Sequence, residues 1–153
     1  KLGADGAFFL YGGTSLLEGR GNEITQLPSP LPLWLVLAKP PLDIPDKTER
    51  MYASLSPLQF TKGQFTQKVV DVLQRGGKVT SSLCYNAFEQ VASRVFPELE
   101  EYRMSFIATG ANGVHLAGAG PTLFTLVENR TCGRKLLHKM KSCGMKTYLV
   151  RTL

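Results

Sequence analysis

Val114-His-Leu-Ala117 and Thr122-Leu-Phe-Thr-Leu-Val127 are two apolar segments with Gly118-Ala-Gly120-Pro121 between them. Their apolar and β-branched content predicts two strands, and the glycines predict a tight turn that joins them. A helical pattern over about residues 131–142 and a strand-like segment over residues 146–153 follow. The last third of the chain is therefore expected to form strand, strand, helix and strand.

One more strand is expected upstream, because the apolar run Leu33-Trp-Leu-Val-Leu-Ala38 is continuous and ends at Pro40-Pro41. Four helical patterns separate it from the strands described above. The first helix is expected to begin after Asp46 as its N-cap. The second is expected to begin after Thr61 as its N-cap and to end at Gly76-Gly77. The third is expected over residues 81–96 and the fourth over residues 98–110. This order predicts an α+β ferredoxin-like sandwich with extra helices.

The N-terminal part predicts a β-hairpin or meander that precedes the sandwich. Phe8-Phe-Leu-Tyr11 and Thr14-Ser-Leu-Leu17 are strand-like and are separated by Gly12-Gly13. Gly19-Arg20-Gly21-Asn22 supplies a second turn, because glycine tolerates the positive φ values that tight turns need.

The composition is that of an ordinary soluble domain, with 153 residues of which 43% are hydrophobic and 20% charged. No apolar run approaches the roughly 20 residues of a membrane span, which argues against a membrane protein. Cys84, Cys132 and Cys143 include no CxxC pair, which argues against disulfides and zinc and favours a cytoplasmic location. The formal charge of +6 suits an anionic ligand. The basic residues near 130–141 lack aromatic neighbours, so we expect a solvated helix face and no nucleic-acid partner.

Two short segments are candidates for chemistry. Gly118-Ala-Gly120 either directs backbone N–H groups at a phosphate or is simply a tight turn, since no dinucleotide or Walker A fingerprint is complete. Asp5 has apolar neighbours and is either a turn or cap residue or a partly buried catalytic acid.

Other polar residues admit plainer interpretations. Asn86 and Glu89 lie three residues apart and form either a surface or capping pair or part of a site. His115 and His138 share no ligand spacing with each other or with the cysteines. We therefore expect solitary structural or surface histidines and no metal site.

Several blocks follow one another along nearly the whole chain: Leu2-Gly-Ala-Asp5, Phe8-Phe-Leu-Tyr-Gly12-Gly13, Glu18-Gly-Arg-Gly21, Lys39-Pro40, Lys47-Thr48-Glu-Arg-Met-Tyr52, Asn86-Ala-Phe-Glu89 and Leu116-Ala-Gly-Ala-Gly-Pro-Thr-Leu-Phe124. In this order they resemble the C-terminal half of the 4-diphosphocytidyl-2-C-methyl-D-erythritol kinases, a family of the GHMP kinase superfamily. The resemblance implies an enzyme of non-mevalonate isoprenoid biosynthesis. Such an enzyme uses ATP and Mg²⁺ to phosphorylate the 2-hydroxyl of its cytidine diphosphate methylerythritol substrate.

The resemblance also implies roles for three residues in substrate chemistry. Asp5 matches the catalytic Asp, which acts as general base on the acceptor hydroxyl. Thr48 and Tyr52 match substrate-binding residues at the cytidine end. They are one helical turn apart, and a ring at position 52 can stack on cytosine.

A further match concerns the phosphates. Gly118, Gly120 and Thr122 match the family's third glycine-rich motif, which shapes the phosphate cleft. Ala117 and Ala119 stand where serine or threonine is common, so we expect backbone rather than hydroxyl contacts there. Asn86-Ala-Phe-Glu89 matches an Asn-Asp-x-Glu segment, which we interpret as structural.

The family's ATP-binding loop has no counterpart in this sequence and would precede Lys1. We therefore expect the missing N-terminal half of the same enzyme as a partner, and we predict that this chain alone phosphorylates nothing. Residues 1–30 are expected to end the N-terminal kinase domain, and residues 31–153 to form the GHMP kinase C-terminal domain. The alternatives are another GHMP-type kinase, such as a homoserine or mevalonate kinase, and a non-catalytic ferredoxin-like ligand-binding module.

Overall fold

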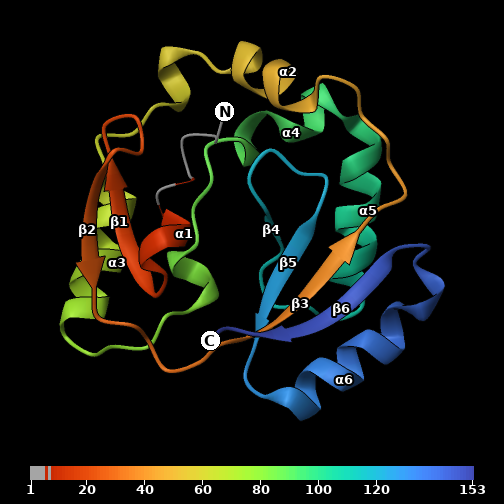
Figure 1. The fold of residues 1–153 in the computed structure, drawn as a ribbon. Helices are drawn as coiled ribbons and strands as arrows, with labels where there is room; N and C mark the ends of the chain where they lie inside the picture. The colour runs from red at the N-terminus through yellow and green to blue at the C-terminus, as the bar shows by residue number, and fades with distance from the viewer. Residues whose placement is uncertain (1–5, 7) are drawn as a thin grey trace. The chain divides into compact units, whose positions relative to one another are not determined.

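The computed structural model describes residue 6 and residues 8–153 (Figure 1). These residues form two compact units. One contains the described residues up to 32 together with residues 63–79 and Leu153, and the other contains residues 33–62 and 80–152. The division of the chain at residue 30 stays a prediction.

The second unit is built on a four-stranded antiparallel sheet. Its spatial order is β4 (His115–Leu116), β5 (Leu123–Val127), β3 (Trp34–Lys39) and β6 (Lys146–Arg151). Figure 1 shows the orange β3 between β5 and the dark blue β6. In chain order this is second, third, first and fourth, which is the strand order of a ferredoxin-like sandwich. The predicted fold class is therefore confirmed.

Alternate residues of the central strand form the core. Val36 and Ala38 of β3 have no exposed surface. Phe106 of α5 (Pro97–Ala108) and Leu136 of α6 (Arg130–Lys139) belong to the same buried cluster. Both helices therefore cover the same face of the sheet. The limits of α5 agree with the predicted helix, and α6 continues into the short 3-10 helix η4 (Met140–Ser142) as expected.

The helix expected over residues 81–96 is wrong in its first half. The structure has a 3-10 helix η3 (Ser81–Leu83), then an irregular segment, and then α4 (Glu89–Val95). The Asn86 side chain accepts a hydrogen bond from the Phe88 amide at 3.0 Å. Asparagine favours such local bonds to the backbone over a continuous helix, which explains the break.

The helix α2 (Lys47–Ser54) begins directly after Asp46, as predicted, and a 3-10 helix η2 (Pro57–Gln59) follows it. The capping bond is wrong, because the Asp46 side chain accepts no hydrogen bond from the helix and its backbone is left-handed, with φ 50°. What anchors α2 is Met51, which is fully buried in the core.

The first unit contains the predicted hairpin. β1 (Thr14–Glu18) pairs with β2 (Glu23–Leu27) across a turn in which Gly19 and Gly21 have positive φ. The strand expected at residues 8–11 is wrong, because these residues form one helical turn, α1 (Phe8–Tyr11), closed by the Gly12 amide on the Phe8 carbonyl at 2.9 Å. Four apolar residues in a row do not distinguish a strand from a helix by periodicity.

The second helix of the first unit starts later than expected. The helix α3 (Gln64–Gln74) has Gly63 as its N-cap instead of Thr61, because Gly63 adopts the left-handed conformation (φ 79°) that turns the chain into the helix. The predicted stop is confirmed by the positive φ of Gly76. None of the helices in residues 8–153 is both long and apolar enough to cross a bilayer.

Candidate functional site

The glycine turn, residues 117–122, connects β4 to β5 as predicted. The Ala117 amide donates to the Thr122 carbonyl at 2.9 Å, and the Gly120 amide donates to the Ala117 carbonyl at 2.9 Å. Gly118 and Gly120 both have positive φ, at 55° and 79°. A Cβ on Gly120 would lie 2.7 Å from Leu116 Cδ1, so the close packing of the turn on β4 also requires glycine there.

Two amides of the turn have no partner among the described residues. Neither the Gly118 nor the Ala119 N–H donates a hydrogen bond to another residue that the structure describes. Gly118 and Ala119 are exposed and half-buried respectively. Adjacent free N–H groups in a glycine-rich turn are suited to an anion such as a phosphate.

The carbonyl groups of the turn are bonded by side chains from two other segments. Asn86 Nδ2 donates to the Leu116 carbonyl at 2.9 Å and to the Gly118 carbonyl at 2.8 Å. Lys47 Nζ donates to the Gly120 carbonyl. The turn is thus held from its carbonyl side by residues that lie far from it in the sequence.

Glu89, the first residue of α4, holds the strand β4 that leads into the same turn. One of its carboxylate oxygens accepts the Leu116 amide at 2.8 Å and lies 3.4 Å from His115 Nδ1. His115 Nε2 lies 2.7 Å from the Ser81 hydroxyl. These contacts agree with the structural interpretation of both the Asn86–Glu89 segment and His115.

Thr48 and Tyr52 lie one turn apart on α2, and both side chains are exposed. Tyr52 is 63% exposed and packs edge-on against Phe88, with ring centroids 5.0 Å apart and an interplanar angle of 85°. Phe88 comes two residues after Asn86, and Lys47 precedes Thr48. The helix that carries Thr48 and Tyr52 is therefore linked to the glycine turn directly by Lys47, and indirectly by Tyr52 through Phe88.

Asp5, the predicted catalytic base, lies outside the described residues. Within residue 6 and residues 8–153, no three His, Cys, Asp or Glu side chains come together as a possible metal site. Burial raises the pKa of the Cys84 thiol, and the negative charge of Glu89 raises it further. A thiol that holds its proton in this way is a poor nucleophile, so Cys84 has no evident catalytic use.

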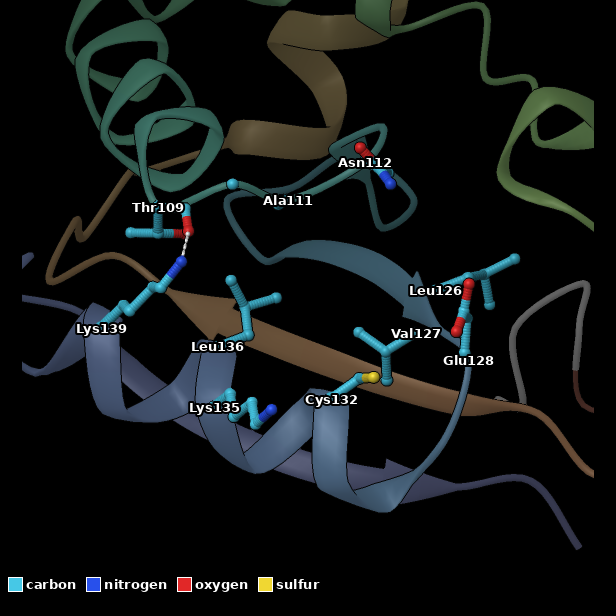
Figure 2. Close-up of a pocket in the computed structure, with 11 residues that line it drawn as sticks. Thr109, Ala111, Asn112, Leu126, Val127, Glu128, Cys132, Lys135, Leu136 and Lys139 are labelled. Carbon is cyan, nitrogen blue, oxygen red and sulfur yellow. Dashed lines mark hydrogen bonds between the residues drawn. The ribbon is translucent and has the colours of Figure 1, made fainter.

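A separate pocket of about 310 Å³ lies between α6, the end of β5 and the loop after α5 (Figure 2). Apolar side chains such as Val127 and Leu136 line it, together with Lys135 and with Lys139, whose ammonium donates to the Thr109 carbonyl at 3.2 Å. It contains no residue of the glycine turn and neither Thr48 nor Tyr52. The pocket is therefore not part of the candidate site.

Known proteins resemble this chain along its whole length. The family described as GHMP kinases C terminal matches residues 71–145. A 4-diphosphocytidyl-2-C-methyl-D-erythritol kinase of Dehalococcoides mccartyi is 46% identical over 154 residues, which cover 100% of this chain and 54% of the relative. The chain thus contains the domain that the C-terminal family model of the GHMP kinases describes, and it resembles the C-terminal half of these kinases over its whole length. One such kinase of Shouchella clausii is 31% identical over 153 residues, covering 100% of this chain and 51% of the relative.

Solved structures resemble the chain as well. A crystal structure of 4-(cytidine 5'-diphospho)-2C-methyl-D-erythritol kinase matches this chain with a TM-score of 0.76 and 29% identity, covering 97% of this chain and 53% of the other. The homoserine kinase of Cytophaga hutchinsonii matches with a TM-score of 0.68 and 20% identity, over 97% of this chain and 50% of the other, which supports the fold alone. The chain spans about half the length of the curated relatives that it matches.

Sequence reasoning identified the glycine turn but missed the side chains that hold it. Asn86 and Glu89 form a visible Asn-x-x-Glu pair, yet their spacing does not indicate which carbonyls or amides they bind. Lys47 directly precedes Thr48 in the sequence. No local pattern connects Lys47 to Gly120, because 73 positions separate the two residues.

Proposed function

We propose that the protein containing this chain transfers the γ-phosphoryl group of ATP to the 2-hydroxyl of 4-diphosphocytidyl-2-C-methyl-D-erythritol. The substrate hydroxyl oxygen forms a bond to the γ-phosphorus, the bond from that phosphorus to the β–γ bridging oxygen breaks, and ADP leaves. This step belongs to non-mevalonate isoprenoid biosynthesis and is expected in the cytoplasm.

The observation that carries the proposal is the 46% identity to a kinase of this name along the full length of the chain. The geometry of the glycine turn supports it. The unpartnered amides of Gly118 and Ala119 suit the phosphates. Gly120 and Thr122 stabilise the turn by their backbone hydrogen bonds to Ala117. In this role the turn stabilises charge by fixed dipoles, which is the main catalytic device in phosphoryl transfer.

Tyr52 and Thr48 are proposed to bind the cytidine end. The Tyr52 ring packs at nearly a right angle to Phe88 and is 63% exposed, so much of the ring is accessible to a base. Stacking of a base on such a ring contributes about 1–3 kcal/mol. The Thr48 hydroxyl lies on the same side of α2, one turn earlier, and is suited to a hydrogen bond with the cytidine.

Asp5 is proposed as the general base that accepts the proton of the 2-hydroxyl as the new bond forms. Mg²⁺ remains an expectation from the family resemblance. Among the described residues, no three His, Cys, Asp or Glu side chains come together to bind it. The roles proposed here are those of side chains and backbone amides of this chain.

The test uses the full-length protein, assayed with ATP and each of three acceptors: 4-diphosphocytidyl-2-C-methyl-D-erythritol, homoserine and mevalonate. Turnover is expected with the first acceptor only. Turnover with homoserine or mevalonate would favour the alternative of a different GHMP kinase. Absence of turnover with all three would favour a non-catalytic ligand-binding module.

The role of Asp5 has its own variant. Asp5→Asn is expected to lower kcat by about 100-fold or more with little change in the KM for the acceptor, because a general base supplies about 10²–10⁴. The measurement is steady-state kinetics, with the melting temperature as a control for folding. A variant with nearly unchanged kcat would contradict the role of general base.

A further inference from the structure

Asn86 is the one side chain that bonds to two carbonyl groups of the glycine-turn region among the residues the structure describes. We propose that Asn86 is a positioning residue, which aims the Ala119 amide at the phosphate chain of the phosphoryl donor. This inference rests on the proposed function and deepens it. It assigns to Asn86 a role in binding the phosphoryl donor.

The hydrogen bonds of Asn86 determine the orientation of its amide group. Its nitrogen lies 2.9 Å from the Leu116 carbonyl oxygen and 2.8 Å from the Gly118 carbonyl oxygen, and both of these atoms can only accept. Its oxygen lies 3.0 Å from the Phe88 amide, which can only donate. All polar positions are satisfied in this orientation, and the opposite one would place acceptor against acceptor.

The planar peptide group transmits this contact to the free amide. The Gly118 carbonyl and the Ala119 N–H belong to one trans peptide, in which the two groups point in opposite directions. When Asn86 binds the carbonyl, the N–H is directed away from Asn86. The Ala119 N–H is also one of the two amides of the turn with no partner among the described residues.

The neighbouring peptides of the turn have other constraints. The Ala117 carbonyl accepts the Gly120 amide within the turn, so the Gly118 N–H on the same peptide points outward. The Gly120 carbonyl is bound by Lys47, and the next residue, Pro121, has no N–H to direct. Asn86 is therefore the residue whose side chain controls the direction of the Ala119 amide.

The decisive variant is Asn86→Asp in the full-length protein. Aspartate keeps the shape and the oxygen that accepts the Phe88 amide, but it has no hydrogen to donate and places a negative charge against two carbonyl oxygens. We expect kcat/KM for ATP to fall about tenfold or more, because removing one fixed donor to a developing oxyanion costs about 10²–10³ and here the donor is misdirected rather than removed. The KM for the cytidine substrate is expected to stay within about threefold, since Thr48 and Tyr52 are unchanged.

Two controls separate positioning from folding. Asn112→Asp makes the same chemical change at an exposed asparagine away from the turn and should leave both constants unchanged. Glu89→Gln keeps an oxygen that accepts the Leu116 amide, so the hydrogen bond between α4 and β4 should survive. A fall in melting temperature with equal losses for both substrates would overturn the inference, as would unchanged constants in Asn86→Asp.

A readout independent of turnover is the amide NMR signal of Ala119. Titration of the full-length protein with ATP should shift this signal in the unmodified protein and shift it much less in Asn86→Asp. Equal shifts in both proteins would contradict the positioning role. If the unmodified protein shows no turnover, the proposed function fails, and the NMR comparison still decides the role of Asn86.

Discussion

Gly118 and Gly120 are two residues apart and both have left-handed backbones, yet their surroundings differ. A Cβ on Gly118 would meet no atom within 4 Å, whereas a Cβ on Gly120 would lie 2.7 Å from Leu116 Cδ1. A left-handed backbone costs an L-residue about 1–2 kcal/mol. At residue 118 this conformational free energy is the whole cost of adding a side chain. At residue 120 the cost of the steric clash with Leu116 is added to it.

We therefore predict that Gly120→Ala destabilises the chain more than Gly118→Ala does. Gly118→Ala should lower the free energy of unfolding by about 1–2 kcal/mol and Gly120→Ala by about 2–5 kcal/mol, since overpacking adds about 1–3 kcal/mol. Urea denaturation of the two variants measures the difference. Equal losses would mean that Leu116 moves aside without cost.

The helix α6 has an N-cap at its start and a buried glycine where it packs on the sheet. Asn129 caps its start by accepting the Cys132 amide at 2.9 Å. Gly133, one turn into the helix, is buried against the sheet, where an added Cβ would lie 2.3 Å from Leu149 Cδ1 and 3.3 Å from Val127 Cγ2. A glycine that would normally weaken a helix thus lets α6 approach the sheet closely.

Gly133→Ala is predicted to destabilise the chain by about 1–2 kcal/mol, even though alanine in a helix interior is normally favoured over glycine by about 1 kcal/mol. The reason is the clash with Leu149. In a double-mutant cycle with Leu149→Ala, the two losses should be less than additive, with a coupling of about 1 kcal/mol. A Gly133→Ala variant that is more stable than the parent would show that α6 moves away from the sheet at little cost.

At the scale of the whole molecule, the sheets differ in how well their strands are protected. β3 is flanked by β5 and β6 and has residues with no exposed surface. The hairpin of β1 and β2 is a two-stranded sheet in which no strand residue is fully buried. Isolated two-stranded hairpins are marginally stable in water.

Native-state hydrogen exchange should therefore be uneven along the chain. We predict that the hydrogen-bonded amides of β3 exchange at least about tenfold more slowly than those of β1 and β2, because buried strands open only with the core. Exchange followed by NMR or mass spectrometry at neutral pH measures this. Equal protection of the hairpin and of β3 would contradict the prediction.

Much of the fold was predictable because its signals are local. The apolar run at 33–38 and the glycine turn between two apolar segments produced the correct strands, and the order of elements led to the ferredoxin-like class. The errors came from segments with competing local preferences. Residues 8–11 are too few to show a period, and Asn86 bonds to its neighbouring backbone where a helix was expected.

The sequence by itself determined most of the elements, their order and the position of the glycine turn, since these depend on backbone preferences of residues close together in the chain. Only the tertiary structure decided which side chains hold that turn. Asn86 meets Leu116 across 30 positions and Lys47 meets Gly120 across 73, once the sheet and the helices on it are assembled. Hydrogen bonds of this kind depend on distances in space, which a local sequence pattern does not contain.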